Sequence, residues 1–189
     1  MAVSASEDLF RDHAVIRRLL LVFSYFSRRI RHKEDYDERV LFDAAKLFGE
    51  FGSYHADEEE KLVFPLFRDT YLQPITKGYE QDHVEVKALT AQLITLTKRS
   101  SYREAKAYSI LDALVALYTA HAAHEDLSII ARLGSFISVD RTAKLVADME
   151  QFERDRIGPK GFDQAVEMLS KIERPLGINT TALYGTKSK

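Results

Sequence analysis

Apolar residues recur at intervals of three and four along most of the chain, which is the spacing of amphipathic helices. The pattern predicts four long helices, at about residues 6–32, 37–64, 75–98 and 102–133. Ser4 and Glu7 form a candidate capping box for the first helix, and Pro65 stops or kinks the second because proline lacks a backbone donor. No stretch alternates as a strand would. The expected fold is all-α, an antiparallel up-down four-helix bundle.

Two additional C-terminal helices are expected at about residues 140–157 and 161–173, separated by a Gly-Pro-Lys-Gly break. We therefore predict three parts. Residues 1–136 form the bundle, residues 137–176 form a helical extension packed on it, and residues 177–189 form a loose polar tail.

Composition and charge narrow the classes of function. The formal net charge of the 189 residues is −2, which gives no electrostatic footprint for nucleic acid. The longest strongly apolar stretch, residues 19–23, is too short to cross a membrane, and no signal core precedes it, so we expect a cytoplasmic protein. There is no cysteine, so a metal ion would have to be bound by His, Asp, Glu or Tyr. Whether the chain forms a homo-oligomer is left open.

Histidines and glutamates interrupt the apolar stripes of the four long helices. The first and third helices each carry one such histidine, and the second and fourth each carry a His-x-x-x-Glu pair whose side chains share one face. In an up-down bundle these positions fall at one level, because every helix rises about 1.5 Å per residue. The set comprises His13, His55, Glu59, His83, His121 and Glu125.

Burying so many ionisable groups without compensation would cost several kcal/mol each. A single buried histidine is more often a hydrogen-bonded core residue, but four at matching levels favour metal coordination. We predict two metal ions, each near two imidazoles, with Glu59 and Glu125 as bridges. Imidazole and carboxylate ligands suit iron or manganese, and zinc is an alternative.

Several nearby residues are further candidates, and some of them have more than one interpretation. Glu58 is an alternate bridge to Glu59, since its spacing from the histidine also reaches the site. Tyr118 donates a hydrogen bond to a metal-bound ligand, binds the iron itself, or packs in the core. His124 is an alternate ligand, a neighbour that orients one, or an exposed residue. His32 suits the dipole at the end of the first helix and is expected to be structural.

The motifs together resemble the hemerythrin-like family, which is described by a His-His-Glu cation-binding motif. The resemblance covers about residues 8–133 and is carried by Asp12-His13, His55-x-x-x-Glu59 followed by Leu62-x-Phe64-Pro65, Asp82-His83, and His121-Ala-Ala-His-Glu125. It implies a non-haem di-iron centre, with two iron ions joined by carboxylates and an oxo or hydroxo bridge. It also implies the six residues above as ligands.

Two positions depart from the oxygen-carrying members of that family. Those members have a further histidine where this chain has Lys87, and an aspartate ligand where Asp126 stands, although Glu125 points more directly at the partner metal. The chain therefore looks closer to the six-ligand bacterial branch, which is tied to nitric oxide or peroxide responses and iron handling. The expected partner is a small diatomic molecule or peroxide.

Three functions follow as alternatives. The first is binding or sensing of dioxygen, nitric oxide or peroxide, or iron handling. The second is a di-iron redox enzyme of the peroxidase or nitric oxide reductase type, and the third is a helical module in which the metal is purely structural. A ferritin-like site is disfavoured, because it needs Glu-x-x-His on two helices and only Glu80-x-x-His83 fits.

Overall fold

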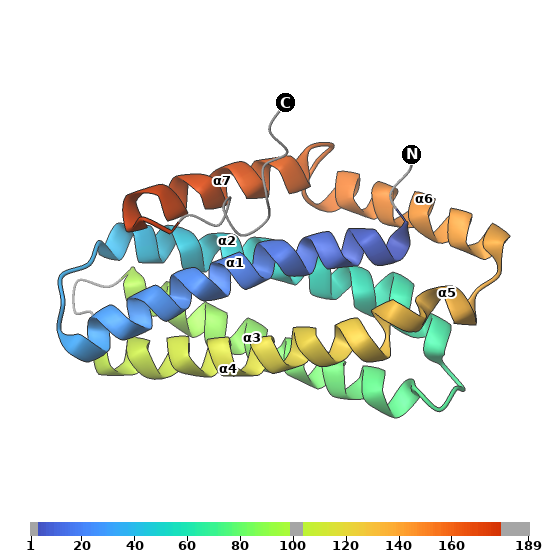
Figure 1. Cartoon of the computed structure of the whole chain (residues 1–189), viewed down its shortest axis with the longest axis horizontal. Helices are drawn as coiled ribbons and strands as arrows, with labels where there is room; N and C mark the ends of the chain where they lie inside the picture. The colour runs from blue at the N-terminus through green and yellow to red at the C-terminus, as the bar shows by residue number, and fades with distance from the viewer. Residues whose placement is uncertain (1–3, 99–103, 179–189) are drawn as a thin grey trace.

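A computed structural model describes residues 4–98 and 104–178, and within these ranges the chain is all-helical, as predicted (Figure 1). Each long helix packs against the next along the chain, and the fourth packs against the first, which closes an up-down bundle. No helix in these ranges is long and apolar enough to span a membrane. The four helices are α1 (Ala5–His32), α2 (Glu38–Glu58), α3 (Gln73–Thr97) and α4 (Glu104–Ser128).

The helix starts follow from local hydrogen bonding. The predicted capping box is present, because the Glu7 amide donates to Ser4 Oγ at 3.2 Å and the Ser4 amide donates to the Glu7 carboxylate at 2.9 Å. The Asp37 side chain caps α2. Helix α3 begins two residues earlier than predicted and includes Pro74, since a proline in the first turn interrupts no helical hydrogen bond. The predicted start of the fourth helix lies outside the described residues.

The predicted end of the second helix was wrong. The α-helix stops at Glu58, and a wider π turn, η1 (Glu59–Val63), and a 3-10 turn, η2 (Phe64–Phe67), replace its last residues. Pro65 explains why the regular pattern is lost here, since it cannot donate to the preceding turn. The π turn falls on the segment that begins with Glu59, and such turns are frequent at functional sites.

The fourth helix also ends earlier than the predicted residue 133. It stops at Ser128, whose hydroxyl donates to the backbone carbonyl of His124 at 2.7 Å. A serine that bonds back in this way weakens the helical ladder. A 3-10 turn, η3 (Ile130–Arg132), and a single turn, α5 (Leu133–Phe136), complete the segment.

The C-terminal helices α6 (Val139–Arg156) and α7 (Gly161–Leu176) lie along α1 and α2 (Figure 1). Helix α7 extends beyond the predicted end and holds Pro175 in its last turn. Arg18 of α1 binds Glu173 of α7 through two hydrogen bonds, the longer of them at 3.0 Å. The division of the chain into three parts stays a prediction, and most of the predicted tail lies outside the described residues.

Two apolar clusters fill the interior, one on each side of a polar layer. On α1, Leu9 belongs to the smaller cluster and Ile16 to the larger, with His13 between them. On α3, Tyr79 and Val86 flank the buried histidine in the same way. Helices α2 and α4 contribute to the larger cluster, and residues that follow them in the chain, such as Val63 of η1 and Ile129, contribute to the smaller one. The fold therefore brings one polar position from each long helix to the same level.

Candidate metal centre

The six predicted ligand residues lie together in this polar layer. None of them is more than 2% exposed, although all are ionisable. Helices α1 and α3 each contribute one imidazole, and α2 with its π turn and α4 each contribute an imidazole and a carboxylate. The residues are His13, His55, Glu59, His83, His121 and Glu125.

Each glutamate joins two imidazoles from different helices. Glu59 Oε1 lies 3.2 Å from Nε2 of His55, and Glu59 Oε2 lies 3.4 Å from Nε2 of His83. Glu125 Oε2 lies 3.2 Å from Nε2 of His121 and 3.6 Å from Nε2 of His13. The geometry expected from the two His-x-x-x-Glu spacings is therefore present, and each carboxylate reaches two helices.

The imidazoles themselves form two pairs. The rings of His13 and His55 have centroids 4.8 Å apart, and those of His83 and His121 are 4.9 Å apart. Both glutamates span from one pair to the other. This is the arrangement that two metal ions need when each is bound by two imidazoles and both share the same carboxylates.

A second ring of carboxylates fixes the imidazoles from outside. In all four histidines Nδ1 faces a carboxylate oxygen, so Nδ1 carries the hydrogen and Nε2 keeps its lone pair for the centre. Metal-binding histidines are held in the same way. The Nδ1–oxygen distances are 2.6 Å for His13–Asp126, 3.3 Å for His55–Asp12, 2.9 Å for His83–Glu60 and 3.1 Å for His121–Asp82.

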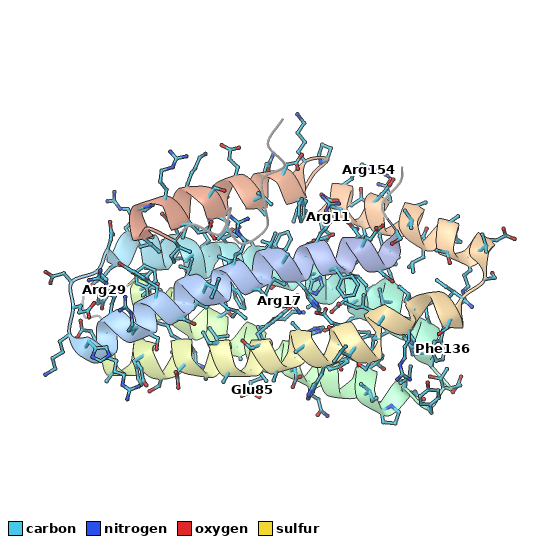
Figure 2. All side chains as sticks on the ribbon, viewed as in Figure 1. Arg11, Arg17, Arg29, Glu85, Phe136 and Arg154 are labelled. Carbon is cyan, nitrogen blue, oxygen red and sulfur yellow. The ribbon has the colours of Figure 1, made fainter. Side chains whose placement is uncertain are left out.

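Basic side chains hold two of these outer carboxylates. Arg17 pairs with Asp126 and donates to the backbone carbonyl of Ala122, and Figure 2 shows it between α1 and α4. Lys87 lies 3.9 Å from Glu60 and donates to Asp57 at 2.9 Å. Lys87 therefore supports the outer ring rather than standing in for a ligand.

The unpaired atoms of the layer fit metal ions. Nε2 of all four imidazoles and both oxygens of both glutamates are buried, and none makes a hydrogen bond within the described residues. Buried polar atoms are nearly always paired, so eight unpaired ones at one level call for a ligand. Among the six predicted ligands, candidate ligand atoms within 4.8 Å of one another form two sets: His13, His55, Glu59 and Glu125, and Glu59, His83 and His121.

The pKa values of the two glutamates also favour a bound cation. Burial alone would raise the pKa of Glu59, but His55 and His83 outweigh it and hold that pKa well below its usual range. Burial and the charge of Glu59 raise the pKa of Glu125 to about 7. Two buried carboxylates so close do not both ionise readily without a cation. Burial also lowers the pKa of His13 to about 4, so its imidazole is neutral near pH 7.

The further residues singled out from the sequence have different surroundings. Asp126 orients His13, whereas His124 is exposed on α4. Tyr118 is buried, with its ring centroid 5.0 Å from that of His121. Glu58 is buried outside the six-residue set, where it accepts a hydrogen bond from the Tyr54 hydroxyl at 3.1 Å. The ligand roles of all these residues stay predictions.

Sequence reasoning did not assign three of the outer carboxylates. Asp12, Glu60 and Asp82 each stand directly beside a predicted ligand in the sequence. A neighbouring residue points about 100° further round the helix, so each reaches the imidazole of an adjacent helix rather than its own neighbour. The acidic residues next to His13, Glu59 and His83 were the available signal.

The chain belongs to the hemerythrin family. Its residues 4–133 match the Hemerythrin HHE cation binding domain, which confirms the resemblance seen in the motifs. Uncharacterized proteins of Mycobacterium bovis and of two strains of Mycobacterium tuberculosis are 28% identical over 182 residues, covering 93% of this chain and 71% of theirs. No solved structure matches. Fold, site and family together define a metal-binding helical protein.

Proposed function

We propose that this protein is a non-haem di-iron protein that binds or senses a small oxidant, such as dioxygen, nitric oxide or peroxide, or handles iron. One observation carries the proposal: eight buried, unpaired nitrogen and oxygen atoms meet at one level, with every imidazole fixed from outside. Four imidazoles and two carboxylates suit iron or manganese better than the tetrahedral sites of zinc. Iron bound there would supply redox chemistry and open coordination positions.

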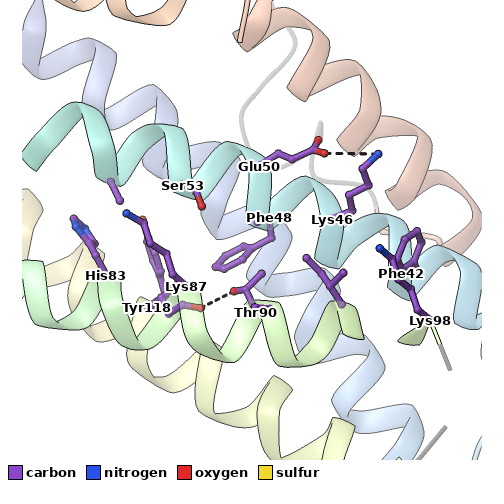
Figure 3. A pocket seen from close by; sticks show the side chains of 16 residues that line it. Phe42, Lys46, Phe48, Glu50, Ser53, His83, Lys87, Thr90, Lys98 and Tyr118 are labelled. Carbon is purple, nitrogen blue, oxygen red and sulfur yellow. Dashed lines mark hydrogen bonds and ion pairs between the residues drawn. The ribbon is translucent and has the colours of Figure 1, made fainter. Parts of the chain in front are cut away.

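A pocket between α2 and α3 gives a small molecule access to this layer. It has a volume of about 440 Å³, and its inner wall includes His83 and Tyr118. Figure 3 shows His83 at one end of the pocket and Phe42 with Lys98 at the other. Gly52 of α2 lines it, and the largest part of the exposed lining is apolar. An uncharged oxidant fits such a passage.

Metal analysis and absorption spectroscopy test the proposal directly. Freshly purified protein should hold about two iron ions per chain, and the aerobic protein should absorb in the near ultraviolet, as an oxo-bridged di-ferric centre does. A colourless protein with zinc would support a purely structural metal and would contradict the proposal. Stopped-flow mixing of the reduced protein with dioxygen, peroxide or nitric oxide then measures which of them reacts.

Filling the pocket tests the access route. A Cβ atom at Gly52 would meet no other atom within 4 Å, so Gly52→Leu should extend into the pocket without a clash. We expect it to slow the reaction with the oxidant by about tenfold while leaving the iron content unchanged. Gly78→Leu is the matched control, because Gly78 also lies in a helix, has equal free space and does not line the pocket.

The same kinetics decide between binding and catalysis. The pocket is larger than a diatomic molecule requires, which is the observation that favours a redox enzyme as the second candidate. Repeated turnover of peroxide or nitric oxide under a supply of reductant would establish an enzyme. A single binding event that reverses when the gas is removed would establish a carrier or sensor.

A further inference from the structure

A second group of acidic side chains, two of them buried and one partly exposed, lies beside the metal centre, on the far side of His55. Its members are Asp8 and Asp12 of α1 and Glu58 of α2. Candidate ligand atoms of Asp12, His55 and Glu58 lie within 4.8 Å of one another. Glu58 is fully buried, and its Oε2 makes no hydrogen bond within the described residues. This oxygen is a buried ligand atom that lacks a partner.

Asp8 connects this acidic cluster to a cavity between α1 and α6. Asp8 and Asp12 are one helical turn apart on the same face of α1, so their carboxylates are neighbours. The cavity, of about 170 Å³, is lined by Asp8 and by Glu150 and Glu153 of α6. Arg11 also lines it, 3.3 Å from Asp8 and stacked on an aromatic ring of α7 (Figure 2). Three carboxylates therefore outnumber one guanidinium at this opening.

The other opening has the opposite charge. The pocket between α2 and α3 is lined by Lys46, Lys87 and Lys98, and by one carboxylate, that of Glu50. A divalent cation is repelled by such a lining and is not solvated by apolar walls. The cavity between α1 and α6 offers both negative charges that attract the cation and carboxylate oxygens that can bind it. The pocket between α2 and α3 thus suits an uncharged molecule, and the cavity between α1 and α6 suits a divalent cation.

We propose that Asp8, Asp12 and Glu58 form a transient site for a divalent cation, through which metal ions reach the centre from the groove between α1 and α6. The proposal rests on the proposed function, because the centre must take up its metal from solution. Carboxylate oxygens with water suit a hard divalent ion. Nδ1 of His55 faces Asp12 at 3.3 Å, so the transient site lacks a free imidazole lone pair and binds less tightly than the centre.

Loading kinetics of the metal-free full-length chain test this route. Mixed with Co²⁺ in a stopped-flow instrument, the wild-type chain develops visible absorption as its imidazoles and carboxylates bind the ion. We expect Glu58→Gln to slow loading by about tenfold or more, because it removes a carboxylate ligand of the transient site, with the same number of ions at saturation. Asp8→Asn should slow it less, since Asp8 is partly exposed. Asp112→Asn, at an exposed acid of α4, is the matched control.

Wild-type loading rates in the Glu58→Gln variant would overturn the proposal. So would a lower saturating number of ions, because Glu58 would then be a ligand of the centre itself. A wild-type rate that falls with rising salt, and that falls less steeply in Asp8→Asn, supports the route. The readout counts ions rather than reactivity. A chain that loads two ions by this route without reacting with any oxidant would contradict the proposed function alone.

Discussion

The metal centre and the acidic cluster beside it both consist of buried polar groups in one bundle, but they satisfy those groups differently. In the centre every imidazole is fixed at Nδ1, and its Nε2 turns toward a shared space with Glu59 and Glu125. In the acidic cluster the carboxylates of Asp8, Asp12 and Glu58 face one another from only two helices.

This difference indicates why an ion would stay in the metal centre but pass through the acidic cluster. Four helices supply imidazole nitrogens in fixed orientations and bridging carboxylates to the centre, so a bound ion finds its full set of ligands. Two helices supply only carboxylates to the cluster, and burial, followed by the charge of Asp12, raises the pKa of Glu58 to about 9. Near pH 7 a cation must therefore displace the proton of Glu58 to bind there, so the cluster holds it less tightly than the centre does.

The largest expected effect is loss of a ligand from the centre. His55→Ala or His121→Ala should lower bound metal and stability together, because metal binding is coupled to folding. We expect a loss of about 3 kcal/mol in the free energy of unfolding, which is about 6–12 °C in Tm for a chain of this size. Metal analysis and thermal unfolding of the same preparations measure both quantities.

Two histidines of the same chain provide the controls for that experiment. His32 and His124 are exposed and lie outside the polar layer. His32→Ala and His124→Ala should leave the metal content and Tm near those of the wild type. Unchanged metal content in both His55→Ala and His121→Ala would end the assignment of the centre.

An intermediate effect is expected from the outer carboxylates. Asp82→Asn and Asp126→Asn replace the charged acceptors of the Nδ1 hydrogens in His121 and His13 by neutral amides, which accept more weakly, and they keep the shape of each side chain. Metal affinity should fall about 10–100-fold, because the imidazoles are oriented less firmly and become weaker ligands. Competition with a chelator measures this affinity. Asp43→Asn, at an exposed position of α2, should not change it, and equal affinities in all variants would contradict the role of the outer ring.

The smallest effect concerns the acidic cluster without metal. Burial and the charge of Asp12 raise the pKa of Asp8 from 3.8 to about 6, although Arg11 opposes the shift. Folded Asp8 thus binds its proton at higher pH than the unfolded chain does. Its contribution to stability is complete below pH about 4 and is lost as pH rises to about 6.

Asp8→Asn removes this dependence on pH. Relative to the wild type, the metal-free variant should gain about 1–3 kcal/mol between pH 4.5 and pH 7, over any constant offset from the lost pair with Arg11. Denaturant unfolding at several pH values measures the difference. Parallel pH profiles for the two proteins would show that Asp8 lies in an ordinary environment, and the contrast between the two regions would weaken.

The helical fold and the six-residue set were predictable because both depend on spacing along single helices. Residues four apart, such as His55 and Glu59, share a face whatever the neighbouring helices do. The helix ends were less predictable. A single proline, Pro65, and a serine that bonds back to the helix, Ser128, changed the local hydrogen bonding and moved two boundaries.

The outer carboxylates and the acidic cluster depend on how helices are rotated against each other. Asp12 and Asp82 find their partners on the adjacent helix, which the period of one helix does not determine. The opening at Glu150 and Glu153 requires α6 to lie along α1, and α6 belongs to the segment after the family match. Features that depend on the rotation and placement of neighbouring helices were therefore the ones that sequence reasoning missed.

The polar layer has a mechanical consequence for the bundle, because it divides the apolar interior between Leu9 and Ile16 on α1 and between Tyr79 and Val86 on α3. The layer crosses the bundle at the level of all four helices. Without a ligand the two halves have little apolar contact across it, so each can open with some independence. Ions bound in the polar layer would hold the two halves of the bundle together. The cooperativity of unfolding would then report on metal occupancy.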